Sequence, residues 1–451
     1  MARNRVIYQS QAVYVSQSAY DGDLTASGDV VALQRVQSAN YSFSVSRQDV
    51  NQFGELAAID RIIIDTPSVS FDSSYYVNGL GNEEALGFEI TPSGVPMSGS
   101  VGPNEASGVV AGPALTSCIS GIINSATTAN QKDYFVLTTA EGADAADLQT
   151  SGSYESIIGI GNGFMTSYST EAAVGGLPTA SVSVEGQNMN FVNLPIRTGD
   201  NVNQTSPNNL AILNPGFRLG TVNGVSDQLQ YISGISPAVN ATDGTKVSQN
   251  VALPVYSGNA MESATSEISS LRPGDITISL YSHNTAADID NDLMNGASTA
   301  QNLINGADIA DAHIQSFNVS FDLSRTPIER LGSRFAFARV VDFPITSSLS
   351  VDAVLADLTS GSIADFINCD DSYDAVIKMK SAGDCNVPTD KPVVAAILMR
   401  KLKLDSESFT SSIGDNKSVT LDFSNQIGGP EQTDVGIFMS GFNNITTNRG
   451  Y

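Results

Sequence analysis

Alternation of apolar and polar residues is the clearest pattern in the chain, and it predicts a protein built mainly of β-strands. In 40–46 and again in 319–324, apolar and polar positions alternate with a period of two. The apolar positions are Tyr41, Phe43 and Val45 in the first stretch, and Val319, Phe321 and Leu323 in the second. Successive side chains of a strand point to opposite faces, so one face of each strand is expected to be buried and the other wet.

Other segments with β-branched and aromatic residues predict further strands, at 6–16, 62–71, 134–139, 156–160, 276–281, 375–379 and 393–404. Phe164–Gly186 predicts a hairpin that turns at Gly175-Gly176, and Gly161-Asn162-Gly163 predicts a turn before it. Apolar residues at helical spacing predict a helix over Val351–Ile367. The Gly- and Ser-rich stretch 78–131 is expected to be a long loop with a short helix at 114–123.

The chain contains one 25-residue stretch twice. Gln37–Arg61 and Gln315–Arg339 align without a gap at an offset of 278, and ten of the 25 positions are identical. Composition alone would give about one or two matches. Both copies predict a strand, a polar arm of about a dozen residues around Gly54 or Gly332, and a second strand.

A weaker match extends the repeat. Ser418–Ser424 aligns with Ser181–Gln187 at an offset of 237, which makes the first copy about 41 residues longer, since 278 − 237 = 41. We therefore expect a first domain at 1–191 with the long loop 78–131, a linker or small inserted module at 192–271, and a second domain at 272–451.

Composition limits the classes of function. The net charge is −25, and Ser, Thr, Asn and Gly take the place of charged residues, which make up only 15%. Such a chain should be repelled by nucleic acid. Its three cysteines form no CxxC pair, so free thiols are expected rather than a disulfide framework. The N-terminus has no apolar signal region and no run of 18 apolar residues occurs, so neither secretion nor a membrane span is expected.

No catalytic, metal or cofactor site is predicted. The two histidines, His283 and His313, lie in different segments, and no nucleophile motif accompanies them. Asp288–Asp292 resembles the start of a calcium loop, but Leu293 and Thr299 stand where that loop needs Gly and Glu. The Gly159–Gly163 run is interpreted as a turn rather than a dinucleotide loop.

Four arginines recur at equivalent positions of the two copies: Arg47 and Arg61, and Arg325 and Arg339. Two interpretations stay open. They bond local carbonyl groups at strand ends, or they pair with carboxylates of a neighbouring subunit. A duplicated β-domain without an active site points to a structural part, since two similar domains can occupy equivalent places in a ring. Three chains would then supply six units.

On the two copies, Gln37–Arg61 and Gln315–Arg339, and on the hairpin Gly163–Gly186, the chain resembles the major tail tube proteins of long-tailed bacteriophages. The resemblance is to the variety in which the tube domain is duplicated. It covers about 300 residues and leaves 192–271 without a counterpart.

The resemblance implies two tandem β-sandwich or half-barrel domains, each with a flanking helix. It implies homotrimeric rings stacked into a hollow tube, which conducts the tape-measure protein during assembly and DNA during ejection without specific binding. It places the protein in the virion tail, and in the host cytoplasm during assembly, with other tail proteins as partners and no membrane.

The resemblance makes the segments 48–60 and 326–338 the stacking arms. We expect ring contacts from Arg47, Gly54, Arg61, Arg325, Gly332 and Arg339, and a channel lining from the wet face, namely Ser42, Ser44, Ser46, Ser320, Asp322 and Ser324. The alternatives are a baseplate or tail-tip ring protein, which would not stack, and a β-rich adhesin.

Overall fold

The computed structural model describes most of the segments for which strands were predicted. The longer described ranges are 11–16, 30–63, 68–91, 117–123, 131–139, 154–193, 273–283, 312–329, 338–355, 372–380, 393–410, 418–428 and 435–440. Shorter pieces are described at 212–213, 221–222, 225–226, 250–251, 253, 271, 303–304, 307–308 and 331. The expected mainly-β fold is confirmed. Most of the loop 78–131 and of the segment 192–271 lies outside the described residues, as does Gly332.

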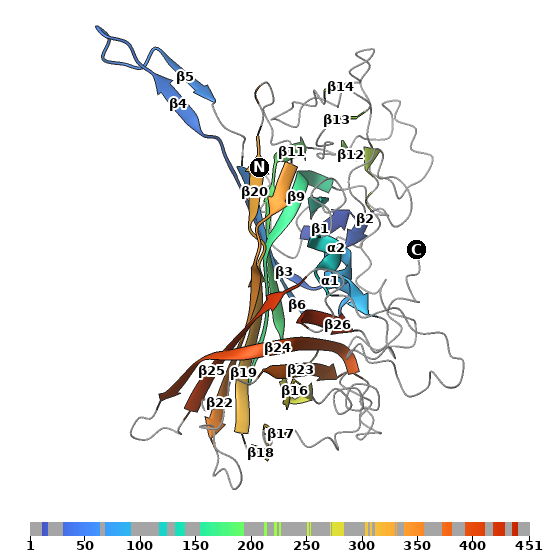
Figure 1. The fold of residues 1–451 in the computed structure, drawn as a ribbon. Helices are drawn as coiled ribbons and strands as arrows, with labels where there is room; N and C mark the ends of the chain where they lie inside the picture. Colours follow the sequence, from blue (N-terminus) through green and yellow to red (C-terminus); the bar gives the residue numbers. More distant parts are fainter. Residues whose placement is uncertain are drawn as a thin grey trace.

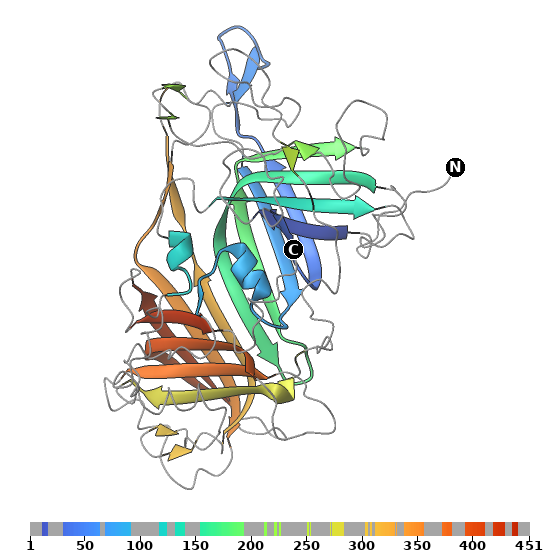
Figure 2. The same cartoon turned by 90° about the vertical axis from the view of Figure 1, so that its right-hand side faces the viewer.

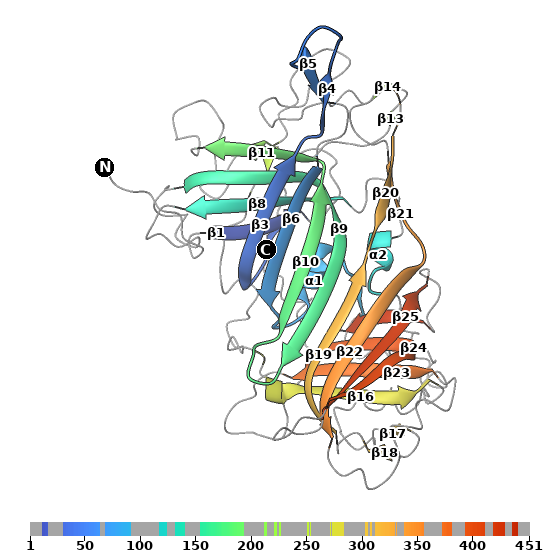
Figure 3. The same cartoon turned by 90° about the vertical axis from the view of Figure 1, so that its left-hand side faces the viewer.

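One long antiparallel sheet, here called the principal sheet, forms the spine of the molecule (Figures 1 and 3). Its strands lie in this order: β3 (Val36–Ser44), β6 (Ser68–Tyr76), β10 (Thr179–Gly186), β9 (Tyr154–Ala173), β19 (Ala312–Asp322), β22 (Ile345–Leu355), β25 (Ser418–Ile427) and β24 (Val393–Thr410). Strands from both halves of the sequence therefore share one sheet, and they meet where β9 pairs with β19.

A second layer covers only one face of the principal sheet (Figure 2). The first half of β9 leaves the sheet and pairs with β8 (Lys132–Thr139) and β11 (Asn188–Asn193). Beyond β8 lie β1 (Gln11–Ser16) and β2 (Val30–Ala32). The first half of β24 also leaves the principal sheet, and it pairs with β23 (Tyr373–Lys380) and β26 (Gly436–Ser440). Strand β16 (Ile276–Ser282) pairs with β23, and β7 (Ile90–Thr91) pairs with β26.

Short helical segments and small hairpins complete the described structure. The helices are α1 (Gly81–Leu86) and α2 (Ser120–Ile123), with the 3-10 turn η4 (Pro273–Asp275). Two hairpins extend from the principal sheet: β4 (Arg47–Val50) with β5 (Asp60–Ile63), and β20 (Arg325–Ile328) with β21 (Ala338–Val341). Two-residue strands pair as β12 (Ile212–Leu213) with β15 (Asn250–Val251), β13 (Thr221–Val222) with β14 (Val225–Ser226), and β17 (Leu303–Ile304) with β18 (Ala307–Asp308).

The two halves have the same strand order. The sequence β3-β6-β10-β9 is matched by β19-β22-β25-β24, and irregularities of register fall at equivalent places. Between β3 and β6 the register shifts at Val36/Ser38, and between β19 and β22 at Ile314/Ser316, an offset of 278 in both cases. A bulge in a strand pair is a specific feature, so its repetition supports the alignment of the two copies.

The weaker part of that alignment needs a correction of two residues. The bulge in β9 lies between Met165 and Ser167, opposite Val184 and Ser183, and the bulge in β24 lies between Leu404 and Ser406, opposite Phe423 and Asp422. Both comparisons give an offset of 239, where the sequence match suggested 237. A slip of two residues keeps every side chain on its face of the sheet, which is why the pattern of apolar residues did not reveal it.

A buried aspartate holds each long strand where it changes sheets. The backbone N–H of Asn162 in β9 donates to Asp133 Oδ1 (3.0 Å), and that of Lys401 in β24 donates to Asp374 Oδ1 (2.8 Å). Asn162 and Lys401 both have positive φ, 55° and 60°. The turn predicted at Gly161-Asn162-Gly163 is therefore wrong, since β9 continues through these residues with a bend.

The helix predicted from Val351 is also wrong over its first five residues. Val351–Leu355 belongs to β22, whose buried Val351 and Ala353 alternate with Asp352 and Val354. Strands β19 and β25 pair with β22 on its two sides. The backbone hydrogen bonds and packing of these pairings favour a strand more strongly than the local spacing of apolar residues favours a helix. Residues 356–367 lie outside the described residues. The short helix expected at 114–123 is described only as α2.

Candidate assembly surface

The face of the principal sheet opposite the second layer carries no described element (Figures 1 and 3). We call it the uncovered face. Ser42 and Ser44 on β3 lie on it, as do Ser320 and Asp322 on β19. The sequence predicted all four as the lining of a channel, and that role stays a prediction. The predicted Ser46 and Ser324 are exposed but lie just beyond the ends of β3 and β19.

Hydroxyl groups pair across neighbouring strands of this face. Ser42 Oγ lies 2.7 Å from Ser70 Oγ, and at the equivalent place in the second half Ser320 Oγ lies 2.8 Å from Ser348 Oγ. Ser38 and Ser74 form a similar contact of 2.6 Å. Such cross-strand pairs stabilise neighbouring strands modestly and leave a hydrogen-bonded polar surface.

Six carboxylates lie among these hydroxyl groups, by their register and exposure: Asp72, Glu171, Glu185, Asp322, Asp352 and Asp422. Asp422 accepts hydrogen bonds from Ser406 (2.6 Å) and Ser350 (2.7 Å), and these bonds lower its pKa. Asp352 accepts from Ser316 and Thr420 at 2.7 and 2.6 Å. Hydroxyl donors favour the ionised form of a carboxyl group, so the face is negative.

Described cations also contact this face. Arg339 forms an ion pair with Glu185 (2.9 Å), and Lys403 lies opposite Ser424 in the register. Six carboxylates lie on the same face. The balance over the described uncovered face is therefore acidic.

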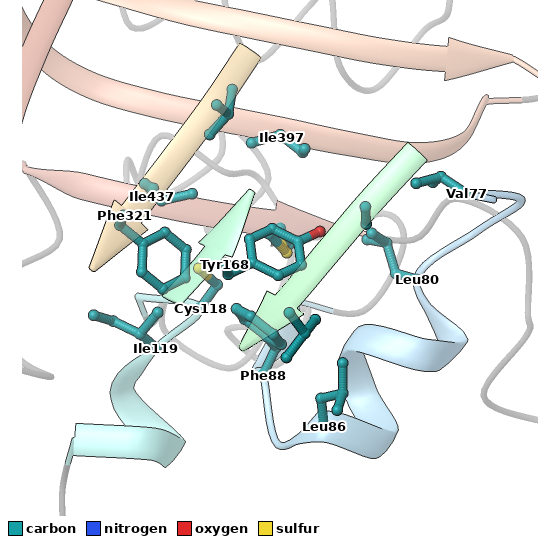
Figure 4. Close-up of a cluster of buried hydrophobic side chains, with 14 of the residues drawn as sticks. Val77, Leu80, Leu86, Phe88, Cys118, Ile119, Tyr168, Phe321, Ile397 and Ile437 are labelled. Carbon is teal, nitrogen blue, oxygen red and sulfur yellow. The ribbon is translucent and has the colours of Figure 1, made fainter. Parts of the chain in front are cut away.

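The contact between the two halves is a closely packed joint within the sheet. Strand β19 pairs with β9 from Ser316↔Ala173 to Asp322↔Ser167. Behind the strands, Tyr168 and Phe321 pack with Phe88, at ring-centroid distances of 4.8 to 6.0 Å (Figure 4). The hydroxyl of Tyr168 donates to buried Glu83 (3.0 Å). Burial raises the pKa of Glu83, and hydrogen bonds from Tyr168 and Tyr75 act against that rise.

Two of the recurring arginines fasten the β20–β21 hairpin to the first half. Arg325 donates through Nη2 to the carbonyl of Ile122 (2.9 Å), and its guanidinium lies 4.7 Å from the centre of the Phe164 ring. Arg339 lies 5.7 Å from the same ring and pairs with Glu185. Burial, and then the charge of Arg339, lower the pKa of Arg325 to about 10. The Ile122 carbonyl is not local, since it lies 203 residues away in the sequence, and Glu185 belongs to the same chain. Pairing of the arginines with a neighbouring subunit stays a prediction.

The equivalent hairpin of the first half, β4–β5, projects beyond the sheet (Figure 1). Arg61 pairs with Asp49 of the same hairpin (2.5 Å), and both side chains are largely exposed. Arg47 is exposed as well. Gly54 sits at the tip with φ 94°, a conformation that favours glycine. Beside it, Phe53 and Leu56 are fully exposed.

The described part of the chain gives little support for a catalytic site, a metal site or a membrane-spanning helix. His283 Nδ1 lies 2.9 Å from the buried Asp374, without the accompanying motif of a nucleophile in the sequence. The described His, Cys, Asp and Glu side chains include no group of three able to hold a metal ion. Within the described ranges, no helix has the length and apolar character to cross a membrane.

Comparisons with known proteins give weak matches. No protein-family model and no curated protein matches the chain. Among solved structures, it is similar to a chain in the tail of an empty GTA particle with C6 symmetry, at 14% identity and a TM-score of 0.18, over 26% of this chain and 81% of that one. A chain of the native gene transfer agent virion gives 14% identity and a TM-score of 0.17, over 26% and 83%.

Proposed function

We propose that the protein is a virion tail tube subunit, which forms rings that stack into a hollow tube. The observation that carries this proposal is the principal sheet itself. One of its faces is uncovered, acidic and rich in hydroxyl groups, and it runs without interruption from one repeat to the other. A surface of this kind suits the lining of a wide, water-filled channel.

The internal joint supplies the pattern for a ring. Two repeats already stand side by side within one chain, joined at β9 and β19. Three chains would place six repeats around an axis, with the uncovered face inward and the second layer outward. Each ring of three would carry a formal charge of 3 × (−25) = −75.

An acidic lining suits the passage of DNA. Duplex DNA carries one negative charge per ~1.7 Å, and a basic channel would bind it. The carboxylates of the uncovered face, such as Asp352 and Asp422, would instead keep DNA in water, with no specific binding. During assembly in the host cytoplasm, the tape-measure protein would occupy the same channel. In the finished virion, the tube subunit would be part of the tail.

The hairpins would connect one ring to the next. Fully exposed Phe53 and Leu56 at the tip of β4–β5 need an apolar partner, and so does Leu331 beside β20. Arg47 and Gly54 lie on the first hairpin, and Arg325 and Arg339 hold the second in place. In this arrangement the two hairpins make chemically different stacking contacts.

Electron microscopy tests the proposal directly. Purified protein, alone or nucleated by a tail tip, should form hollow tubes with a regular ring repeat in negative stain. Single closed rings that never stack would favour a baseplate or tail-tip ring protein instead. Monomers under every condition, with or without the tail tip, would contradict both.

A further inference from the structure

The principal sheet ends in two strands whose counterparts in the other repeat are paired. Strand β3 is the counterpart of β19, at an offset of 278, and β24 is the counterpart of β9, at an offset of 239. Strands β19 and β9 pair with each other. Within the described residues, the outer edge of β3 and the outer edge of the 403–410 part of β24 have no partner strand. Such edges present rows of unpaired N–H and C=O groups.

Side chains at these edges are exposed where their counterparts are buried. Tyr41 and Phe43 on β3 are 40% and 42% exposed, whereas the equivalent Val319 and Phe321 on β19 are 0% and 2% exposed. On β24, Phe409 is 48% exposed, whereas the equivalent Thr170 is 1% exposed. Each edge thus carries apolar side chains on the face that the second layer covers elsewhere.

Glu407 gives an independent indication that the β24 edge is incomplete. It occupies the position of Tyr168, the central residue of the internal joint. Its two carboxylate oxygens are shielded from water and have no hydrogen-bond partner in the described structure. Its neighbours on the same face of β25, centred on Leu421, are apolar. An unsatisfied polar group is costly, so this edge is incomplete in the single chain.

We propose that β24 of one copy pairs antiparallel with β3 of the next, in the register of the internal joint. The internal pairs Phe321↔Tyr168, Ser320↔Ser169 and Val319↔Thr170 become Phe43↔Glu407, Ser42↔Ser408 and Tyr41↔Phe409. This inference rests on the proposed function, because it describes how the rings close. It assigns the two surfaces and one register, with a second copy of this chain as the partner.

The hydrogen-bond pattern of the internal joint identifies the best positions for a test. Leu323 N donates to Thr166 O (2.7 Å) and Val174 N to Gln315 O (2.8 Å). By alternation, Ser320 and Ser169 form a pair without mutual backbone bonds, whose Cα atoms lie about 4.5 Å apart. A disulfide accepts Cα distances of about 4.4–6.8 Å. The transferred pair Ser42 and Ser408 has the same geometry, and both side chains are exposed.

Cysteine cross-linking of assembled tubes tests the register. Chains that carry both Ser42→Cys and Ser408→Cys are assembled, oxidised mildly, and separated without reducing agent. We expect disulfide-linked oligomers that end in one closed covalent species, three chains in size. The internal pair Ser169→Cys with Ser320→Cys is the positive control, since it should close within one chain. Each single variant controls for the native cysteines.

Two shifted pairs make the result decisive. Ser44→Cys with Ser408→Cys, and Ser42→Cys with Ser406→Cys, probe registers displaced by two residues and should link poorly. More efficient linking by either shifted pair would overturn the proposed register. Tubes in which only the internal control links would overturn the pairing itself and leave the tube function standing. If the unsubstituted chain formed neither rings nor tubes, the proposed function would fail, and the joint with it.

Discussion

At the scale of single residues, the most informative groups are the aspartates at the two strand bends. Asp133 and Asp374 are buried, and each binds the backbone of a residue with positive φ through one carboxylate oxygen. Burial raises the pKa of both, that of Asp133 to about 7. The bend therefore depends on a carboxyl group that is costly to ionise where it lies.

Asp133→Asn should remove a pH dependence of stability. The pKa of Asp133 in the folded chain lies above the unfolded value of about 3.9. The folded state therefore holds the proton more tightly, and the contribution of this group to stability falls as pH rises from about 4 to about 7. Urea unfolding at several pH values should show that this slope is smaller in Asp133→Asn. The exposed substitution Asp72→Asn should leave it unchanged, and an identical loss in both variants would contradict the assignment.

Lys132, beside Asp133, titrates in a different range. Burial lowers the pKa of Lys132 to about 8. Lys132 therefore makes stability depend on pH only in the range from about pH 8 to its unfolded pKa of about 10.4. The two windows do not overlap. Measurements between pH 4 and pH 7 therefore report on Asp133 without interference from its neighbour.

At the scale of elements, the two hairpins show how one sequence motif takes two structural roles. Arg325 and Arg339 reach Phe164 and Glu185 of the first repeat. At the offset of 239, the second repeat has Lys403 and Ser424 at those positions. Arg47 and Arg61 would meet no carboxylate or aromatic ring there. The hairpin β4–β5 is thus expected to bind its neighbour through other groups, including its apolar tip.

Alanine substitution of the two arginine pairs should separate these roles. Arg325→Ala with Arg339→Ala should destabilise the monomer by about 2–3 kcal/mol, through lost packing on Phe164 and an unpaired Glu185. The matched Arg47→Ala with Arg61→Ala should change stability by no more than about 0.5 kcal/mol, because the pair with Asp49 is exposed. Unfolding midpoints in urea measure both. Equal losses would show that the docking contacts do not hold the hairpin.

The sequence predicted elements where local pattern and tertiary context agree. The hairpin at Gly175 and strand β19 are of this kind, with one face buried and one wet. Strand β3 was predicted as a strand too, but its apolar face, with Tyr41 and Phe43, is exposed in the single chain. The elements that were predicted wrongly depend on tertiary contacts that the local sequence does not contain. Val351 lies between two partner strands, which local spacing does not reveal. The role of Asp133 could have been found by aligning it with Asp374, but only after the long strands β9 and β24 were in register.

At the scale of the whole molecule, charge and architecture support the same function. The second layer covers one face of the principal sheet, and the other face carries carboxylates, among them Asp422, whose pKa is lowered by hydroxyl donors. That face extends across both repeats. If β3 of one copy pairs with β24 of the next, the ring would therefore have an acidic, hydroxyl-rich lining around its whole circumference. The net charge of −25 would then act on DNA from every side.

Adding a cation to this face should make the channel hold DNA more tightly than the unsubstituted channel does. Ser348→Lys adds one cation per chain near the middle of the uncovered face, and Thr277→Lys adds one on β16 in the second layer. Tubes of the first variant should retain duplex DNA that has entered them, and added salt should release it, since phosphate contacts weaken as counterions accumulate. Tubes of the second should behave as the unsubstituted protein does. Sedimentation of labelled DNA with preformed tubes measures the difference, and equal retention by both variants would mean that the uncovered face does not line the channel.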